Sequence, residues 1–321
     1  MSYNRGTFNQ TLMDQIIKKK TSPKDVFLQL AVIAALYFAA GAFITLLFQL
    51  INIWLPDVLN DGYYYGMGRP YLGALRFALA TLIVVYPVLL VLARALAKSY
   101  KEDSEKHESR LRKWLVYFTL FLAASIMLGD LISLVWNFLG GELTLRFVLK
   151  SLAMLLVLGT IFAYYRWDLK RENAEGSAKM FFWILSAVVV AGMVTGFIYT
   201  GSPQEERQYQ FDSQRTNDLQ SAQWEIINYW QLKEKLPTGL TELNDSVKGF
   251  VMPVDPETGA AYEYTVKSSN VFELCATFNL ETPQLVGRPA DVGVNDNWQH
   301  AAGRVCFERT IDPELYPFLK D

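Results

Sequence analysis

The sequence predicts a membrane-embedded, all-α bundle of five spans, followed by a small extracytoplasmic α+β domain. Five long apolar runs and a change of charge along the chain support this prediction. Charged residues make up 19% of the 321 residues, below the roughly 25% that is typical of soluble proteins. Residues 1–200 carry 20 Lys and Arg against 13 Asp and Glu, whereas residues 201–321 carry 10 against 19. A basic, apolar part followed by an acidic part indicates two environments.

The five apolar runs are each long enough to cross a membrane. A bilayer core about 30 Å thick requires roughly 20 apolar residues in a helix. Buried helices of a soluble protein are the alternative, but five such runs within 200 residues would overfill a soluble core. We therefore predict a four-span membrane domain over residues 25–172 and a fifth span at 180–200. The runs themselves lie at 26–55, 71–93, 114–139, 143–165 and 180–200.

Basic residues are concentrated in alternate connections. The leading tail, residues 1–24, has five Lys and Arg, residues 94–113 have seven, and residues 166–179 have four. The other connections are nearly free of them, and basic connections stay on the cytoplasmic side. Residues 1–24 are therefore predicted to be a cytoplasmic basic tail, and residues 201–321 to lie outside the bacterial cytoplasmic membrane. Within the tail, residues 8–20 could form a short helix on the membrane surface or a flexible basic segment.

The third and fourth spans are joined by Gly140-Gly141, which predicts a tight turn. Asp130 lies ten residues before Gly140, and Lys150 lies nine residues after Gly141. At 1.5 Å per residue both lie about 14–15 Å from the turn. Because residues at equal depth in an antiparallel hairpin can meet, we expect Asp130 to pair with Lys150.

Further charges lie near the same pair. Glu142 and Arg146 precede Lys150 at four-residue spacing and so share one face of the fourth span, and Arg76 enters the second span from the same side. A charge near the bilayer centre costs on the order of 2.5–3.5 kcal/mol, so we expect Arg76 and Arg146 to reach Glu142 or the outer headgroups. The hypothesis is a static ion cluster that fixes helix packing, and the alternative is a route for protons or solutes. The predicted cluster comprises Asp130, Lys150, Arg76, Glu142 and Arg146.

Three stretches resemble a known family of membrane proteins. They are LRFALATLIVVYPVLLVLARALAK, RKWLVYFTLFLAASIMLGDLISLVWNFLGGELTLRFVLK and FAYYRWDLK. Over about residues 25–172 the chain resembles an uncharacterised bacterial family, the domain of unknown function 5671. The resemblance implies an integral membrane protein, and it implies no particular activity and no catalytic residue.

Residues 201–321 are numerous enough for one small domain. Apolar residues at three- and four-residue spacing predict a helix over about 204–235, which ends at Leu236-Pro237. Gly201-Ser202-Pro203 either breaks this helix from the fifth span or lets it continue. Strands are expected at 261–267 and 271–278, and RVCFER (304–309) follows a loop at 281–303.

The helix, the LP turn and DPETGAAYEY resemble the head of a type II secretion pseudopilin over about residues 210–265. The chain departs from that pattern because its apolar helix is the fifth span, so the resemblance implies a shape and not assembly into a pilus. Pseudopilin heads can hold a calcium ion, and the candidate ligands here would be Asp255, Asp291, Asn295 and Asp296. Their spacing matches no EF-hand loop, and we expect no bound metal and no cofactor.

Cys275 and Cys306 are the only cysteines. If the strands around them pair, a disulfide is within reach, and closing a loop of about 30 residues would stabilise the domain by roughly 3–4 kcal/mol. An oxidising compartment favours the disulfide. Two free, buried thiols are the alternative.

Sequence motifs for chemistry are missing. His107 and His300 have no partner at metal-ligand spacing, and no nucleotide-binding, hydrolase or metalloprotease motif is present. The basic residues flank apolar runs and form no nucleic-acid face. We predict a non-enzymatic envelope anchor that resides in the lipid bilayer and whose outer domain binds a protein or surface polymer. The alternative is a transporter or ion-coupled membrane protein that uses Asp130, Lys150 and Arg76.

Overall fold

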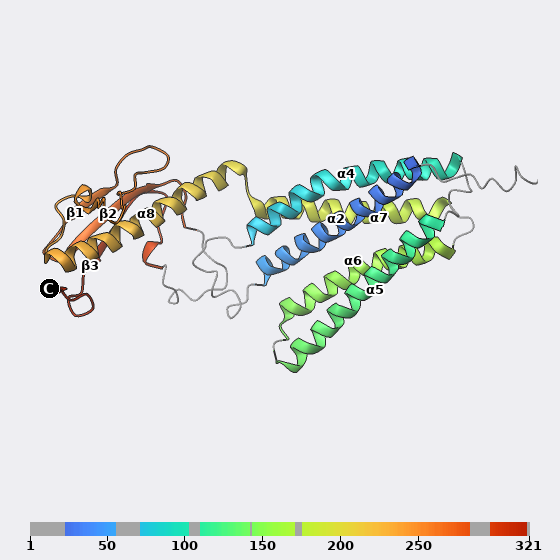
Figure 1. Ribbon diagram of the computed structural model, residues 1–321, viewed down its shortest axis with the longest axis horizontal. Coiled ribbons are helices and arrows are strands. Elements are labelled where there is room, and N and C mark those ends of the chain that lie inside the picture. Colours follow the sequence, from blue (N-terminus) through green and yellow to red (C-terminus); the bar gives the residue numbers. More distant parts are fainter. Residues whose placement is uncertain are drawn as a thin grey trace, which may run out of the picture. The chain divides into compact units, whose positions relative to one another are not determined.

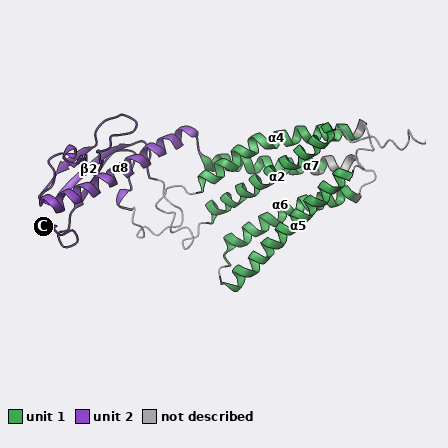
Figure 2. Ribbon diagram, in the orientation of Figure 1, with its two compact units in different colours: residues 1–56, 71–200 green, residues 57–70, 201–321 purple. Residues whose placement is uncertain are grey.

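The computed structural model describes residues 23–55, 71–102, 110–141, 143–170, 175–282 and 296–319. The chain divides into two compact units, which Figure 2 distinguishes by colour, and each is described by itself. The surface helix or flexible segment considered for residues 8–20 lies outside the described residues. Glu142, Asp291 and Asn295 lie outside them as well.

The first unit contains five long helices (Figure 1). Each is long and apolar enough to cross a membrane, so the expected number of candidate spans is confirmed. The first helix has 32 residues and is therefore about 48 Å long, more than one untilted crossing requires. The helices are α2 (Pro23–Trp54), α4 (Leu72–Glu102), α5 (Arg110–Leu139), α6 (Leu145–Lys170) and α7 (Glu175–Thr200).

Helix α2 is the central helix of this unit and packs against α4, α5, α6 and α7. Its buried apolar residues recur every three or four positions, as a single buried helix face requires. They form one core with the buried face of α4, where Leu75 and Leu82 are fully buried. Outside this core the helices leave large apolar side chains exposed, such as Phe77 on α4, Trp136 on α5 and Ile198 on α7. These side chains form the surface expected to face lipid. The α2 core residues are Ala39, Ala42, Phe43, Leu46 and Leu50.

Two glycines on α7 allow a close approach to its neighbours. A Cβ added at Gly192 would lie 2.8 Å from Phe43 Cε2 on α2, and one added at Gly196 would lie 2.9 Å from Leu79 Cδ2 on α4. Small residues at four-residue spacing bring helix backbones together in membranes. The close packing of α7 against α2 and α4 therefore depends on glycine, which has no side chain, at positions 192 and 196.

Helices α5 and α6 form an antiparallel hairpin whose turn contains Gly140 and Gly141. Gly141 has φ +72°, a left-handed conformation that glycine adopts without steric cost. Its N–H donates to Phe138 O at 3.2 Å and closes the end of α5. The tight turn predicted from the sequence is confirmed.

The second unit begins with α8 (Pro203–Lys233), which is capped at both ends. Ser202 Oγ accepts a hydrogen bond from Glu205 N at 3.1 Å, Pro203 occupies the first turn, and Glu234 closes the helix with φ 54°. These are standard start and stop devices. The chain thus begins a new helix after Gly201-Ser202, so of the two possibilities considered for that segment the structure has the break.

A three-stranded antiparallel sheet follows α8. The strands are β1 (Glu263–Val266), β2 (Val271–Phe278) and β3 (Gly303–Thr310), in the order β1-β2-β3. Alternate residues of β2, Phe272, Leu274 and Phe278, are buried with α8 residues in one core, as the two-residue period of a strand dictates. Short 3₁₀ helices lie at Leu240–Leu243 and Asp296–Trp298. The small α+β domain is therefore present.

Candidate functional site

Polar side chains of the first unit meet near the C-terminal end of α2. Arg146 Nε of α6 donates to Asn52 Oδ1 at 2.8 Å, and Asn52 Nδ2 donates to Gln49 Oε1 at 2.9 Å. Arg146 Nη2 also donates to the hydroxyl of Tyr71 at 3.1 Å, and its guanidinium lies 5.3 Å from the centre of that ring. We call Gln49, Asn52, Tyr71 and Arg146 the Arg146 cluster. Its hydrogen bonds join α2, α6 and the residue that precedes α4.

Asp130 of α5 accepts a hydrogen bond at 2.7 Å from Ser151 Oγ of α6, and Ser151 is buried. Lys150, the partner expected from the sequence, instead has its Nζ 6.0 Å from the centre of the Phe48 ring on α2. Successive helical residues point about 100° apart, so Ser151 faces α5 where Lys150 faces α2. The estimate of equal depth located the contact of Asp130 to within one residue, and its pairing with Lys150 stays a prediction.

The other predicted members of the ion cluster are only partly accounted for. Arg76 is half-buried on α4, five residues after Tyr71, and takes part in further contacts. Lys150 and Arg146 also have further contacts. Glu142 lies outside the described residues, so a single cluster of all five charges stays a prediction.

A second group of polar side chains lies near the start of α2, and four helices contribute to it. Arg112 of α5 forms an ion pair with Asp168 of α6, and its guanidinium lies 5.6 Å from the ring centre of Tyr100 on α4. Tyr100 also interacts with the Gln29 side chain of α2. Ser99 Oγ donates to Asp25 Oδ1 at 3.4 Å. We call the whole set the Arg112 cluster: Asp25, Gln29, Ser99, Tyr100, Arg112 and Asp168.

Three members of the Arg112 cluster are deeply buried, with exposed fractions of 8% for Asp25, 3% for Gln29 and 8% for Arg112. Buried charges are tolerated when they are paired and hydrogen-bonded, which the Arg112–Asp168 pair satisfies. The Gln29 carbonyl oxygen differs, because Oε1 is buried and has no hydrogen-bond partner in the described part of the chain. The cluster therefore contains one acceptor whose bonding capacity is unused.

Sequence reasoning missed the Arg112 cluster. Arg112 falls within the predicted basic connection 94–113, and the sequence predicts no contact for Asp168. One feature of the sequence could have indicated it. Asp25 and Gln29 lie four residues apart, which places them on one face of the helix, and this face is the one that carries the buried residues of α2.

Two further polar pairs join helices away from both clusters. The hydroxyls of Tyr37 on α2 and Thr119 on α5 lie 2.8 Å apart, and Tyr86 of α4 donates to Ser186 Oγ of α7 at 2.7 Å. Such bonds are worth about 0.6–2 kcal/mol each inside membranes. They connect pairs of helices, and hence fix which side chains face each other.

In the second unit, Arg215 of α8 lies at the centre of a buried ionic network. Its guanidinium donates to Asp212 at 2.8 Å, to Asp255 Oδ2 at 2.6 Å and to Glu257 at 2.7 Å. Burial acts to raise the pKa of Asp255, but hydrogen bonds from Arg215 and from the backbone of Thr258 and Glu257 outweigh it. The pKa of Asp255 therefore lies well below its usual range.

This network bears on the candidate metal ligands. Asp255 already accepts bonds from a guanidinium, which supplies the positive charge that a metal ion would bring. Asp291 and Asn295 lie outside the described residues, as does the side chain of Asp296. A metal site formed by Asp255 with Asp291, Asn295 and Asp296 therefore stays a prediction.

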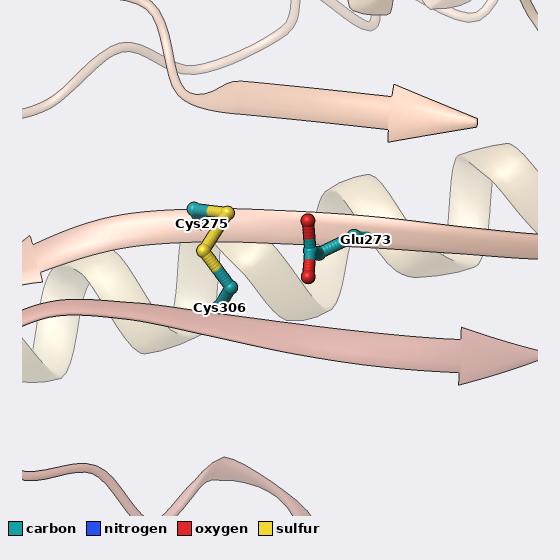
Figure 3. Close-up of side chains that lie close together, drawn as sticks. All are labelled: Glu273, Cys275 and Cys306. Atoms are coloured by element: carbon teal, nitrogen blue, oxygen red, sulfur yellow. A yellow bond between two sulfur atoms is a disulfide. The ribbon is translucent and has the colours of Figure 1, made fainter. Parts of the chain in front are cut away.

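Cys275 of β2 and Cys306 of β3 are directly opposite in the strand register and are joined by a disulfide. Figure 3 shows the Glu273 carboxylate beside them on the same sheet face. The three side chains offer atoms within 4.8 Å of one another. Because metal binding requires thiolates and both sulfur atoms are bonded to each other, this group does not form a metal site.

Residues 25–165 match the family model described as Domain of unknown function (DUF5671). The resemblance to this family is thereby confirmed for α2, α4, α5 and most of α6, while α7 and the second unit lie outside the matched residues. No curated protein and no solved structure matches the chain. The likeness of residues 210–265 to a pseudopilin head stays a prediction.

Proposed function

We propose that the five helices anchor the C-terminal domain to the outer side of the bacterial cytoplasmic membrane, where that domain binds a protein or a surface polymer of the cell envelope. The observation that carries the proposal is the order of the two units. A folded domain follows the fifth apolar helix, and if all five helices cross the membrane, the odd number of crossings would put this domain opposite the basic connections.

The C-terminal domain has the properties of a part that functions on its own. Its core is formed by residues between Leu219 and Ile311, all from the second unit. The Arg215 network and the Cys275–Cys306 disulfide add links between α8, the following turn and the sheet. A disulfide suits an oxidising compartment, in keeping with the proposed location.

The sheet face that points away from α8 is the binding surface we favour. The register places Thr277 opposite Arg304 and Glu273 opposite Glu308 on this face, and three of these four side chains are exposed. Polar side chains on a rigid sheet can hydrogen-bond to a peptide or to a polymer with hydroxyl groups.

Site-specific photo-crosslinking in the native cell tests this proposal. A crosslinking residue replaces Thr277 on the open sheet face and, as the matched control, Ser221, which is exposed on α8. We expect adducts to an envelope protein or polymer from position 277 and far fewer from position 221. Equal yields at both positions, or no adducts at position 277, would contradict binding through this face.

A transporter or ion-coupled protein is the second candidate function, with Asp130, Lys150 and Arg76 on the route. The observation that favours it is the presence of polar groups near both ends of α2. If Asp130→Asn leaves the protein folded but abolishes an ion or solute flux in liposomes, this second function replaces anchoring. If purified protein gives no flux above empty liposomes, the anchor proposal is supported.

A further inference from the structure

Among the residues that the structure describes, the buried carbonyl oxygen of Gln29 has no hydrogen-bond partner, although Gln29 is only 3% exposed. Proteins bury few polar atoms in this state, because the atom loses its bonds to water and gains nothing in return. Gln49, on the same helix, shows the usual arrangement, since its Oε1 accepts a hydrogen bond from Asn52 at 2.9 Å. Gln29 therefore requires an explanation that Gln49 does not.

The surroundings of Gln29 are rich in oxygen atoms. Asp25 lies one turn earlier on the same helix and is buried, and Ser99 of α4 donates to its carboxylate. Tyr100 interacts with the Gln29 side chain from α4. Asp168 lies close to Tyr100 but is held by Arg112. The Asp25 carboxylate of α2 and the Ser99 hydroxyl of α4 thus lie 3.4 Å apart, one helical turn from Gln29, which itself contacts Tyr100. Tyr100 also lies beside the Arg112–Asp168 ion pair of α5 and α6.

We propose that Gln29 Oε1 is a ligand of a bound monovalent cation, such as Na⁺, at the end of the first unit where α2 begins. A carbonyl oxygen only accepts, so its partner must be a hydrogen-bond donor or a cation. Asp25 supplies the charged oxygen and Tyr100 and Ser99 the neutral ones, which are the hard donors that such ions prefer. Divalent ions favour several carboxylates, and here Asp168 is already neutralised by Arg112.

The site is independent of what the C-terminal domain binds, because every residue in it belongs to the first unit. It also differs from the predicted ion cluster, which lies toward the opposite ends of α4, α5 and α6. Gln29 lies where α2 contacts α4, next to the Ser99–Asp25 hydrogen bond. Asp130 lies where α5 contacts α6. A cation at Gln29 would join α2 to α4 and stabilise their contact.

The full-length protein in phosphatidylcholine nanodiscs is used for the test. Thermal unfolding is followed at constant ionic strength while choline chloride is replaced by NaCl or KCl. A bound ion stabilises the folded state by mass action, so we expect a saturable rise in Tm with one of the two alkali ions. Binding of radioactive ²²Na⁺, or competition of K⁺ with ²²Na⁺, then gives the affinity of the wild-type protein for the cation.

Gln29→Met removes the carbonyl oxygen with little change in volume and should weaken the cation response about tenfold or more. Gln49→Met is the matched control on the same helix, and we expect a lower Tm but an unchanged cation response. If Gln29→Met does not fold, Gln29→Glu is used, for which we expect tighter cation binding because a carboxylate replaces the amide.

Three results would overturn the proposal. The first is a Tm that is the same in NaCl, KCl and choline chloride, as expected if only a water molecule occupies the site. The second is a response to Mg²⁺ or Ca²⁺ alone. The third is an unchanged affinity in Gln29→Met, or a lost response in Gln29→Glu.

Discussion

Replacing Gly192 by alanine adds one carbon atom where α7 contacts α2. That atom would lie 2.8 Å from Phe43 Cε2 and 3.5 Å from Leu46 Cδ2. Phe43 is only 7% exposed, so its ring has little room to move away. The added atom therefore forces either the ring or the helix to shift.

The expected magnitude follows from two opposing effects. Overpacking of a filled core costs about 1–3 kcal/mol, whereas exchanging glycine for alanine within a helix contributes about 1 kcal/mol of stability. For Gly192→Ala the net loss is therefore about 0–2 kcal/mol. Gly159→Ala on α6 is the matched control, because a Cβ there meets nothing within 4 Å, and only the favourable helical effect should remain.

Both variants are made in the full-length chain, and unfolding in mixed micelles is followed by tryptophan fluorescence with increasing SDS. We expect Gly192→Ala to be less stable than Gly159→Ala by about 1–3 kcal/mol, the cost of overpacking. A Gly192→Ala protein as stable as Gly159→Ala would show that α7 does not pack against Phe43 as described.

Three further predictions concern the polar contacts. Arg215→Met should destabilise the C-terminal domain by about 3–5 kcal/mol, because it leaves buried carboxylates uncompensated, whereas the exposed control Arg207→Met should change the stability little. Urea unfolding of the fragment 201–321 measures both variants. Equal losses of stability in the two variants would contradict the network. Because the folded-state pKa of Asp255 is lowered, its contribution is fully present above its ordinary pKa of 3.8 and is lost as the pH falls below that value. The stability of the fragment should therefore drop between pH 5 and about pH 2, less steeply in Asp255→Asn, and identical profiles would refute the assignment. Finally, a double-mutant cycle with Asp130→Ala and Ser151→Ala should give a coupling of about 0.6–2 kcal/mol in SDS unfolding, whereas additive losses would exclude the hydrogen bond.

The sequence predicted those features that depend on composition and local spacing. Five candidate spans follow from the length of the apolar runs, and the turn at Gly140-Gly141 follows from the conformational freedom of glycine. The strands were placed within a few residues, and β2 at its observed bounds, because alternation and turn residues mark them in the chain.

Contacts between helices were harder to predict. Depth along a helix is linear in residue number, so spacing alone places Asp130 level with this part of α6. Which side chain faces Asp130 depends on helix rotation, and the hydrogen bond from Ser151 was not predicted. The Arg112–Asp168 pair depends on which helices become neighbours, and single-sequence spacing carries no such information. Arg215 likewise meets Asp255 across 40 residues of sequence.

The central claim is that the C-terminal domain lies on the side of the membrane opposite the basic connections, and thiol accessibility tests it most directly. One cysteine is introduced at Ser269, which is exposed in the C-terminal domain, or at Ser104 in the basic connection 94–113, with the native disulfide retained. Intact spheroplasts are treated with a membrane-impermeant maleimide. We predict that Ser269→Cys reacts at once and that Ser104→Cys reacts only after lysis. The opposite pattern, with the cysteine at 269 protected until lysis, would contradict the account.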